Sequence, residues 1–321
     1  ILKKHRLWYT KFVKRRFYNM KDLVIIGCGP AGLSAAVYAC RAGLSVVMLD
    51  AGAPGGKINL TAELENWPGD QHVAGPELAY RMYEHATSLG AVYEYARVLD
   101  IIDEGETKKV VCDTQTYEAK AVLIASGTKE RQMGLPMEEE LTGRGISYCA
   151  VCDGPFFKGD EVIVIGGGNS ALQEANYLTS FASKVHLVVR RDVFRADKAV
   201  QDKVLKNEKI EVHFLRKPHE IKHENNKVTG LIVSDSNTGE LETIEAKGIF
   251  PFVGMDPVTD FAKGLNITDA QGYILTDENM ETAVKGIYAA GDVRKKVLRQ
   301  VVTATNDGAI AAQSIAHKLG H

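Results

Sequence analysis

The sequence predicts an α/β fold that contains two βαβ units of parallel sheet. Two short runs rich in β-branched residues, 22–26 and 161–165, each end in a glycine-rich turn, and each turn is followed by a helix-period segment and a second strand. A strand, a helix and a further parallel strand in this order form one right-handed unit. The chain has 321 residues, 45% of them apolar and 25% charged, which is enough for two globular domains.

The first unit carries a glycine pattern that is typical of a dinucleotide site. The sequence GCGPAG occupies residues 27–32, a helical segment runs to Ala42, and the next strand, 45–49, leads to an acid. The first glycine permits the turn, the second lets backbone N–H groups approach a pyrophosphate, and the third lets the helix pack on the sheet. The acid is placed to accept the hydroxyls of an adenosine ribose. The candidate residues are Gly27, Gly29, Pro30, Ala31, Gly32 and Asp50.

An uncharged stretch, residues 23–40, has the length of a membrane-spanning segment. The glycines in its first half divide it into a strand, a turn and a helix, so it predicts buried core instead. We therefore expect no membrane as a partner. The formal net charge of −2 gives no reason to expect nucleic acid either.

Loops and further strands follow the first unit. Glycine and proline mark loops at residues 53–57 and 65–69, a helix is expected over 76–90, and a set of strands over 92–124. The last of these strands ends in Ser126-Gly127-Thr128, where we expect the chain to leave the first domain.

Cys149 and Cys152 are the centre of the predicted chemistry. Two thiols three residues apart share one face of a helical turn, so they can close a disulfide and act as one redox switch. Asp153 follows directly and is placed to exchange a proton with a departing thiolate. The same spacing is half of a zinc site, but the three other cysteines are scattered singly, so redox use is favoured and no metal site is predicted. A dithiol switch fits a reducing cytoplasm better than a secreted protein.

The second unit repeats the glycine pattern with one difference. GGGNSA occupies residues 166–171, a helix is expected to about Ser180, and Val189 stands where the first unit has its acid. Arginines without a carboxylate beside the adenosine ribose accommodate a 2′-phosphate, so the expected nucleotide is NADP rather than NAD. A solvated charged face, or an ion pair with Asp192, is the alternative interpretation. The candidate residues are Gly166, Gly168, Asn169, Ser170, Arg190, Arg191 and Arg195.

The rest of the chain predicts a return to the first domain. Short strands are expected over 210–249, a second crossing between domains over 252–257, a strand that runs into Gly291-Asp292, and a small-residue helix over 303–319. Residues 1–19 carry seven lysines and arginines and no acid. Such a leader is typical of a targeting segment, but a disordered extension upstream of Met20 without function is the favoured interpretation.

From Met20 to the C-terminus the sequence resembles the low-molecular-weight thioredoxin reductases of the pyridine nucleotide-disulfide oxidoreductase family. The motifs stand in family order: GxGPAG, a Gly-Gly-x loop, Glu-Asn-x-Pro-Gly, Cys-Ala-x-Cys-Asp-Gly, Gly-Gly-Gly-Asn-Ser-Ala, Arg-Arg-x-x-x-Arg-Ala, Gly-Asp-Val and Arg-Gln. The resemblance implies two Rossmann-like domains, with an NADPH domain over 130–254 inserted into a discontinuous FAD domain made of 20–129 and 255–321. It also implies a homodimer.

The resemblance further implies that both ends of the chain contact FAD. Asp292 would hold the ribitol, and Arg299, Gln300 and Val301 would line the flavin. The other residues implied in FAD binding are Ala51, Gly55, Gly56, Lys57, Asn66, Gly127 and Val293.

In the implied mechanism a hydride passes from NADPH to FAD, and the flavin then reduces the Cys149–Cys152 disulfide. Cys152 resembles the sulfur that faces the flavin, Cys149 the thiol that attacks thioredoxin, and Asp153 the acid/base. Because two partners need one flavin face, the domains of relatives rotate, and the crossings near residues 130 and 254 are the natural hinges.

Three alternatives stay open: an FAD-dependent dithiol oxidase, a ferredoxin-linked reductase of the same fold, and a flavin-loaded redox sensor without turnover. The first two need no NADPH site, so the intact second glycine turn and its arginines speak against them. The third differs from an enzyme in whether NADPH bleaches the flavin. Val189 replaces the histidine of many relatives and Lys57 the commoner glutamine, which leaves the strictness for NADPH and the flavin potential open.

Overall fold

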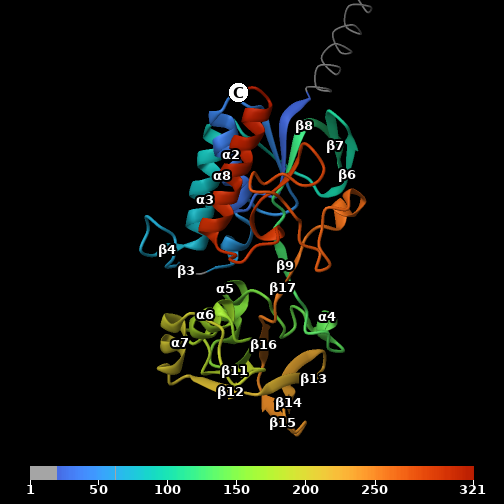
Figure 1. Cartoon of the computed structure of the whole chain (residues 1–321). Helices are drawn as coiled ribbons and strands as arrows, with labels where there is room; N and C mark the ends of the chain where they lie inside the picture. Colours follow the sequence, from blue (N-terminus) through green and yellow to red (C-terminus); the bar gives the residue numbers. More distant parts are fainter. Residues whose placement is uncertain (1–19, 62) are drawn as a thin grey trace, which may run out of the picture. The chain divides into compact units, whose positions relative to one another are not determined.

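The computed structural model describes residues 20–61 and 63–321 and divides the chain into two compact units (Figure 1). Among the described residues, one unit consists of the segment that ends at Thr128 together with Pro257–His321, and the other is Lys129–Asp256. The predictions for the basic leader, residues 1–19, lie outside the described residues. The predicted crossings fall one or two residues from these boundaries, and the assignment of each unit to one cofactor stays a prediction.

The first unit is built on a sheet to which both ends of the chain contribute. In spatial order its strands are β5 (Val92–Tyr95), β2 (Val46–Asp50), β1 (Lys21–Ile26), β8 (Thr116–Ile124), β7 (Thr107–Cys112) and β6 (Val98–Glu104). β1 pairs in parallel with both β2 and β8, and β18 (Ile287–Ala289) adds a further parallel strand on β8. The carboxyl ends of the parallel strands therefore meet at one edge, where such sheets bind ligands.

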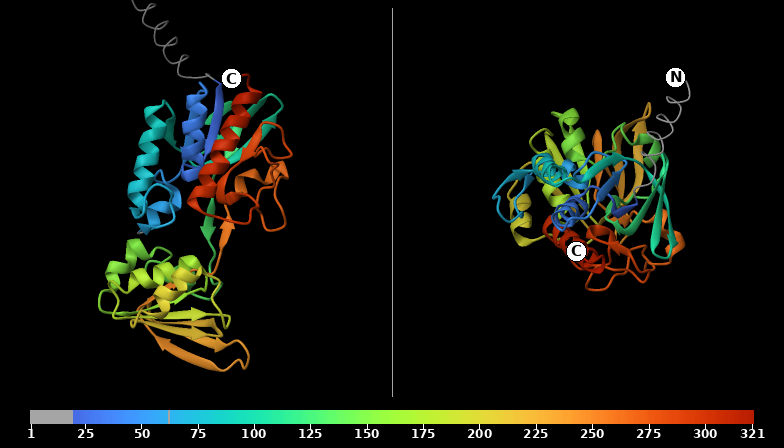
Figure 2. Two further views of the ribbon diagram at one scale, coloured as in Figure 1. Left: turned by 60° about the vertical axis from the view of Figure 1, so that its left-hand side comes forward. Right: turned by 90° about the horizontal axis from the view of Figure 1, so that it is seen from above.

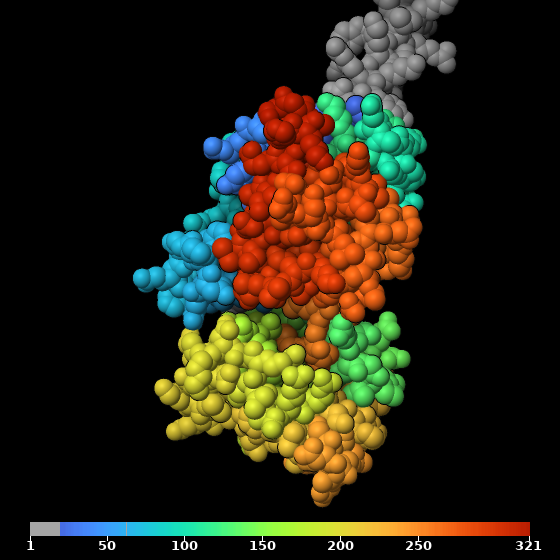
Figure 3. All heavy atoms as spheres, in the orientation of Figure 1, coloured from blue at the N-terminus to red at the C-terminus, as the bar shows by residue number. Residues whose placement is uncertain are grey.

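Three helices run side by side against this sheet: α2 (Pro30–Arg41), α3 (Gly75–Ser88) and α8 (Val301–Lys318) (Figure 2). The close packing of α2 on α8 depends on Gly308, because a Cβ at this position would lie only 2.1 Å from the carbonyl oxygen of Ala31. The C-terminal segment, orange to red, forms one face of this unit in the space-filling view (Figure 3). The final helix was predicted over 303–319, and α8 begins two residues earlier, at Val301.

The second unit contains a four-stranded parallel sheet and a smaller antiparallel one. The parallel sheet has the order β12 (Ile210–Phe214), β11 (Lys184–Val189), β10 (Glu161–Ile165) and β16 (Gly248–Pro251). The antiparallel sheet is β13 (Arg216–Glu224), β14 (Lys227–Asp235) and β15 (Leu241–Glu245). Its helices are α4 (Glu138–Leu141), α5 (Ala150–Asp153), α6 (Asn169–Leu178) and α7 (Lys198–Leu205). The predicted fold class, with two parallel-sheet units of dinucleotide-binding type, is confirmed.

Short elements complete the structure. The two segments where the chain passes between the units, β9 (Thr128–Glu130) and β17 (Met255–Pro257), pair as a two-stranded sheet. The others are β3 (Glu63–Leu64), β4 (Val73–Ala74) and the 3₁₀ turns η1 (Gly56–Leu60), η2 (Gly154–Phe157), η3 (Asp260–Leu265) and η4 (Gly291–Val293). The uncharged stretch 23–40 is divided between β1 and α2, and within the described residues no helix is long and apolar enough to cross a membrane.

Candidate functional site

Cys149 and Cys152 form a disulfide in the second unit, with their Cα atoms 5.3 Å apart. Cys149 is the N-cap of α5, and Cys152 lies in the single turn of that helix. The Cys152 N–H donates to Cys149 Sγ at 3.1 Å, and Ser147 Oγ accepts from the Cys149 N–H at 3.0 Å. The predicted helical turn is therefore present, and it brings the two sulfurs together.

The two cysteine residues differ in their exposure to solvent. Cys152 is exposed, whereas Cys149 is partly buried, as is Asp153, which follows the disulfide on the same helix. Below them, Gly154 packs on α6, where a Cβ would lie 3.1 Å from Leu178 Cδ2. Among the described residues, the groups of side chains suited to a metal ion contain neither cysteine.

The remaining cysteines do not take part in this pair. Cys28 and Cys112 are buried and Cys40 is partly buried, all three as free thiols in the first unit. Burial raises the pKa of Cys28, and the Asp50 carboxylate raises it further. A thiol held protonated in this way is inert in disulfide exchange.

The first glycine turn has the geometry that a dinucleotide requires. Gly27 has φ 103°, and a Cβ there would lie 2.3 Å from the Ala125 carbonyl oxygen. A Cβ on Gly32 would lie 2.0 Å from the Gly27 carbonyl oxygen, so this glycine is needed where α2 meets the turn. A Cβ on Gly29, the N-cap of α2, would have no protein atom within 4 Å apart from neighbouring residues of the chain. The N-terminus of α2, with Pro30 and Ala31, is thus open to a pyrophosphate.

Asp50 lies at the end of β2 and is fixed by backbone donors. Its Oδ2 accepts from the Cys28 N–H at 2.7 Å and its Oδ1 from the Gly52 N–H at 2.9 Å. Burial raises the pKa of Asp50, and these N–H groups act in the opposite direction. Ala51, next to it, is exposed. The acid therefore stands beside the glycine turn, as predicted.

The Gly55-Gly56-Lys57 loop lies over the same turn. The Gly55 N–H donates to the Cys28 carbonyl oxygen at 2.7 Å, and a Cβ on Gly56 would lie 3.3 Å from Gly29 Cα. Both glycines have positive φ, 111° and 56°, which other residues rarely adopt. The loop thus packs against the glycine turn, and Gly56 and Lys57 are the first two residues of η1.

Asp292 carries a polar atom that the protein leaves without a partner. It lies in η4 directly after β18, and within the described residues its buried Oδ1 has no hydrogen-bond partner. Burial raises the pKa of Asp292, while the nearby Lys296 and Lys57 lower it. A buried acceptor without a donor is costly, so it indicates a ligand that brings a hydroxyl. The residues therefore fit the polyhydroxyl chain of FAD.

Asp307 is a buried carboxylate of α8 that the sequence did not single out. It is 4% exposed, and its Oδ2 accepts from the Gly291 N–H at 3.0 Å. The same oxygen is paired with Arg294 Nη1 at 3.0 Å and Lys296 Nζ at 2.7 Å. This network fixes the turn that presents Asp292, and the Asp-Gly pair inside a small-residue helix was its only signal.

The other predicted residues of the C-terminal segment gather at the start of α8. Arg299 Nε donates to the Asp292 carbonyl oxygen at 3.2 Å, and its guanidinium lies 4.1 Å from the centre of the Tyr273 ring. Gln300 caps α8 through a capping box with Thr303, and its Oε1 accepts from Asn66 Nδ2 at 3.0 Å. Val301 begins α8.

Two further predicted residues are backbone positions of this unit. Val293 is fully buried next to Asp292. Gly127 has φ 66°, and its carbonyl oxygen accepts from the Val258 N–H at 3.0 Å. The structure thus brings residues from both ends of the chain to one edge of the first sheet.

The second glycine turn repeats this geometry in the second unit. Gly166 has φ 145°, and a Cβ there would lie 2.6 Å from the Phe252 carbonyl oxygen. Gly168 is the N-cap of α6, and a Cβ there, as at Gly29, would have no protein atom within 4 Å apart from neighbouring residues of the chain. Asn169, the first residue of α6, donates to Asp197 Oδ2 at 2.9 Å and is followed by Ser170. This helix N-terminus is also open to a pyrophosphate.

Beside this turn lies a pocket of about 350 Å³ rimmed by cations. It is lined by residues of the second unit that include Arg131, Arg190, Arg191, Arg195, Arg216 and Lys217. Arg190, Arg191 and Arg195 are exposed, and among the described residues their side chains make no ion pair, with Asp192 or otherwise. Val189 is buried in the core instead. A pocket with this charge suits a phosphate.

The chain matches the family model of the pyridine nucleotide-disulphide oxidoreductases over residues 21–308. The chain belongs to this family. It is 49% identical to the thioredoxin reductase of Bacillus subtilis over 296 residues, and this alignment covers 92% of this chain and 94% of that protein. Among solved structures it is similar to the thioredoxin reductase of Lactococcus lactis in its FR conformation, with a TM-score of 0.91, 45% identity and coverage of 93% and 98%.

These comparisons confirm the resemblance to the low-molecular-weight thioredoxin reductases. They confirm an NADPH-dependent flavoprotein oxidoreductase that uses FAD. A more distant likeness is to the ferredoxin-flavin thioredoxin reductase of Clostridium acetobutylicum, with 31% identity, coverage of 94% and 98%, and a TM-score of 0.52. The fold alone therefore does not identify the electron donor.

Proposed function

We propose that this chain reduces the disulfide of thioredoxin or a thioredoxin-like protein through the Cys149–Cys152 pair. The observation that carries the proposal is that disulfide, held at the N-terminus of α5 in a family member that is 49% identical to a thioredoxin reductase. Electrons reach the pair from NADPH. FAD, when bound, supplies the chemistry that links a two-electron hydride donor to a disulfide.

The chain's own residues perform the thiol exchange. Once the pair is reduced, the Cys149 thiolate attacks one sulfur of the partner disulfide, and the other partner sulfur leaves as a thiolate. Cys152 then attacks the Cys149 sulfur of the mixed disulfide, which restores the Cys149–Cys152 bond and releases the dithiol partner. Asp153 supplies the proton for a departing thiolate. The Cys152 N–H, which points at Cys149 Sγ, helps to hold negative charge there.

The first unit is proposed to hold FAD between its two chain segments. The glycine turn and Asp50 are placed for the pyrophosphate and the adenosine ribose, and Asp292 for the ribitol hydroxyls. The remaining residues assigned to this site are Pro30, Ala31, Ala51, Gly55, Gly56, Lys57, Asn66, Gly127, Val293, Arg299, Gln300 and Val301.

The second unit is proposed to hold NADPH. Gly166, Gly168, Asn169 and Ser170 form the pyrophosphate turn at the start of α6. Arg190, Arg191 and Arg195 are assigned to the 2′-phosphate, because guanidinium groups bind phosphate oxygens in a bidentate manner. The absence of an acid at Val189 supports NADPH over NADH.

A homodimer in the cytoplasm completes the proposal. The family resemblance supports the dimer, and a dithiol that must be kept reduced supports a reducing compartment. Light scattering on the purified protein measures the first, and the fractionation of cells measures the second.

Anaerobic titration of the purified yellow protein tests the proposal. NADPH should bleach the flavin absorbance near stoichiometry, NADH should act only at much higher concentration, and oxidised thioredoxin should restore the colour. A ferredoxin-linked reductase or a dithiol oxidase would keep its flavin oxidised with either nucleotide. A redox sensor would bleach but fail to turn over with thioredoxin. Either result would overturn the proposal.

A further inference from the structure

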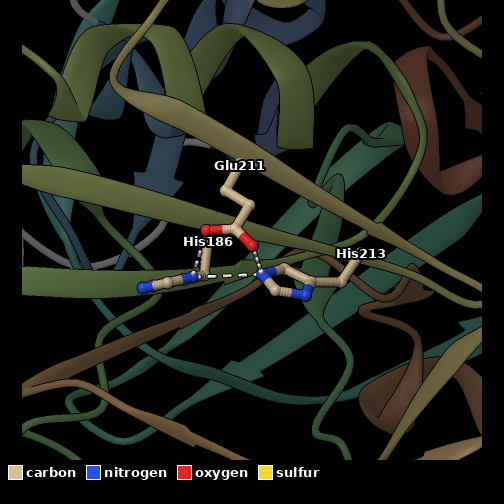
Figure 4. Close-up of side chains that lie close together, drawn as sticks. All are labelled: His186, Glu211 and His213. Carbon is tan, nitrogen blue, oxygen red and sulfur yellow. Dashed lines mark hydrogen bonds and ion pairs between the residues drawn. The ribbon is translucent and has the colours of Figure 1, made fainter.

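Three potential metal ligands lie together in the second unit, far in sequence from the dithiol pair. His186 is in β11, and Glu211 and His213 are in the neighbouring strand β12. The strands are parallel with His186 opposite Glu211, and His213 lies two residues further along, so all three side chains share one face of the sheet. Figure 4 shows them converging, with each carboxylate oxygen directed at one of the histidines.

The distances are close to those of a tetrahedral site. His186 Nδ1 and His213 Nε2 are 3.0 Å apart. His213 Nε2 lies 3.8 Å from Glu211 Oε1, and His186 Nδ1 lies 3.9 Å from the other carboxylate oxygen, Oε2. Two ligands bound tetrahedrally at about 2.0–2.1 Å from a zinc ion lie about 3.3 Å from each other. The ligand atoms of the three residues all lie within 4.8 Å of one another, so a small rotation of the Glu211 side chain brings Oε1 within reach of an ion that the two nitrogens share.

Glu161 fixes the tautomer that such a site requires. Its Oε2 lies 2.7 Å from His186 Nε2, on the side of the ring away from the other two ligands. A carboxylate there accepts a hydrogen bond from the Nε2–H group, so the proton stays on Nε2 and the lone pair of Nδ1 is directed at the centre of the cluster. This arrangement of carboxylate, histidine and metal is how proteins orient metal-binding histidines and raise their basicity. The second ring nitrogen of His213 also points away from the cluster (Figure 4).

The charges around the cluster allow a divalent cation. Lys184 pairs with Glu211 through Oε2, whereas Oε1 is the oxygen directed at His213. Glu211 can therefore give Oε1 to a metal ion and keep Lys184 on Oε2. Glu211 and Glu161 together carry two negative charges, and Lys184 balances only one of them, so a cation is electrostatically favoured here.

Access to the cluster is also suitable. The side chains of His186 and His213 are 9% and 12% exposed, while that of Glu211 is 49% exposed. Because β12 is the edge strand of its sheet, an ion can enter past Glu211 without opening the core.

We propose that His186 Nδ1, His213 Nε2 and Glu211 Oε1 form a binding site for Zn²⁺, with one coordination position left to water. Two imidazoles and one carboxylate are a ligand set that zinc accepts. The ion cross-links β11 and β12. Arg190 of the cation-rimmed pocket follows β11 directly, and Arg216 of the same pocket begins β13, two residues after the end of β12. It holds two strands of the nucleotide-binding unit together and takes no part in thiol exchange.

Calorimetric titration of the untagged full-length holoprotein with ZnCl₂ tests the site. The protein is first treated with a chelator and kept oxidised, so that the Cys149–Cys152 pair cannot bind zinc. We expect one zinc ion per chain and a rise in Tm on binding. X-ray absorption at the zinc edge should show two imidazole nitrogens at about 2.0–2.1 Å.

Variants locate the ion. Glu211→Gln and His213→Ala should each weaken zinc binding at least as much as Glu161→Gln, for which loss of an outer hydrogen bond predicts about 10- to 100-fold. Since the Glu211 side chain is half exposed and glutamine has nearly the same shape, its variant keeps the core intact even if His213→Ala does not fold. His72→Ala is the matched control, because His72 belongs to an exposed group with Glu63 and Glu65. The absence of saturable binding, or a loss of zinc on His72→Ala alone, overturns the proposal.

Discussion

The backbone N–H of Gly291 donates a hydrogen bond to Asp307 Oδ2 at 3.0 Å, although 16 residues separate them. That oxygen also pairs with Arg294 and Lys296, so one buried carboxylate holds a backbone turn and two cations. The turn continues into Asp292, whose Oδ1 has no partner among the described residues. The position of the residue assigned to the ribitol thus depends on a charge in the next helix.

Asp307→Asn should destabilise the protein and release flavin. The substitution removes the charge with which the buried Arg294 and Lys296 are paired, and the loss of such a buried partner costs about 3–5 kcal/mol in unfolding free energy. Denaturant unfolding and the flavin content after gel filtration measure the two effects. The control is Asp260→Asn, which removes an exposed pair with Lys263 and should change stability by no more than about 1 kcal/mol. Equal effects of the two substitutions would contradict the assigned role of Asp307.

Cys149→Ser should abolish the reduction of thioredoxin while NADPH still bleaches the flavin. The variant keeps the nucleotide sites but lacks the sulfur that attacks the partner. Stopped-flow absorbance measures the flavin step, and a coupled thioredoxin assay measures turnover. Cys40→Ser, which changes a free thiol outside the pair, should retain both steps. If Cys149→Ser also loses flavin reduction, the assigned order of the two sulfurs is wrong.

Replacement of Arg190 and Arg191 by alanine should raise the KM for NADPH by about 10- to 100-fold, since charge-assisted hydrogen bonds contribute about 1.5–3 kcal/mol. The KM for NADH should stay nearly unchanged, because NADH has no 2′-phosphate. Steady-state kinetics with both nucleotides gives the ratio. Arg81→Ala, which breaks an exposed pair with Asp70 in the first unit, serves as a control. A parallel loss with NADPH and NADH would remove the 2′-phosphate assignment.

Glu174→Gln should stabilise the protein increasingly as the pH rises. Glu174 lies in α6, and although the residue is only partly buried, its Oε2 is shielded and has no hydrogen-bond partner among the described residues. Burial raises the pKa of Glu174 from 4.5 to about 7. The native state therefore keeps a proton that the unfolded chain releases, so wild-type stability falls between these two pH values.

The gain of the Glu174→Gln variant over the wild type should grow by about 3 kcal/mol between pH 4.5 and pH 7 and then level off. Denaturant unfolding at pH 5, 6, 7 and 8 measures this difference. Gln173→Ala changes the exposed neighbour on the same helix without removing an ionisable group, so its curve should run parallel to the wild type. A constant difference between Glu174→Gln and wild type would show that the carboxyl does not titrate in this range.

The sequence was sufficient for features that depend on local patterns. Gly27 and Gly166 were predicted because a strand, a turn and a helix follow one another there, and the structure gives both positive φ. The turn that joins Cys149 to Cys152 was predicted from a spacing of three residues. The membership in the family followed from motifs that are each contiguous in the chain.

Contacts set by strand register or by distant chain segments were not predictable in this way. Asp307 gained its role only when α8 was placed beside η4, and nothing near it in sequence names Gly291 as its partner. His186 and Glu211 are 25 residues apart, and their shared face depends on the pairing of β11 with β12. Single-sequence patterns carry no information on such register, because it is decided by the packing of whole strands.

Because the three free thiols are buried or partly buried, the redox state of the Cys149–Cys152 pair can be measured by alkylation. Burial raises the pKa of Cys112 to about 11 and also raises those of Cys28 and Cys40, so these thiols resist alkylation at neutral pH. A short treatment of the native protein with iodoacetamide therefore labels the Cys149 and Cys152 thiols, and only after their bond has been opened. The intact mass of the alkylated chain then reports directly what fraction of the molecules carries a reduced pair.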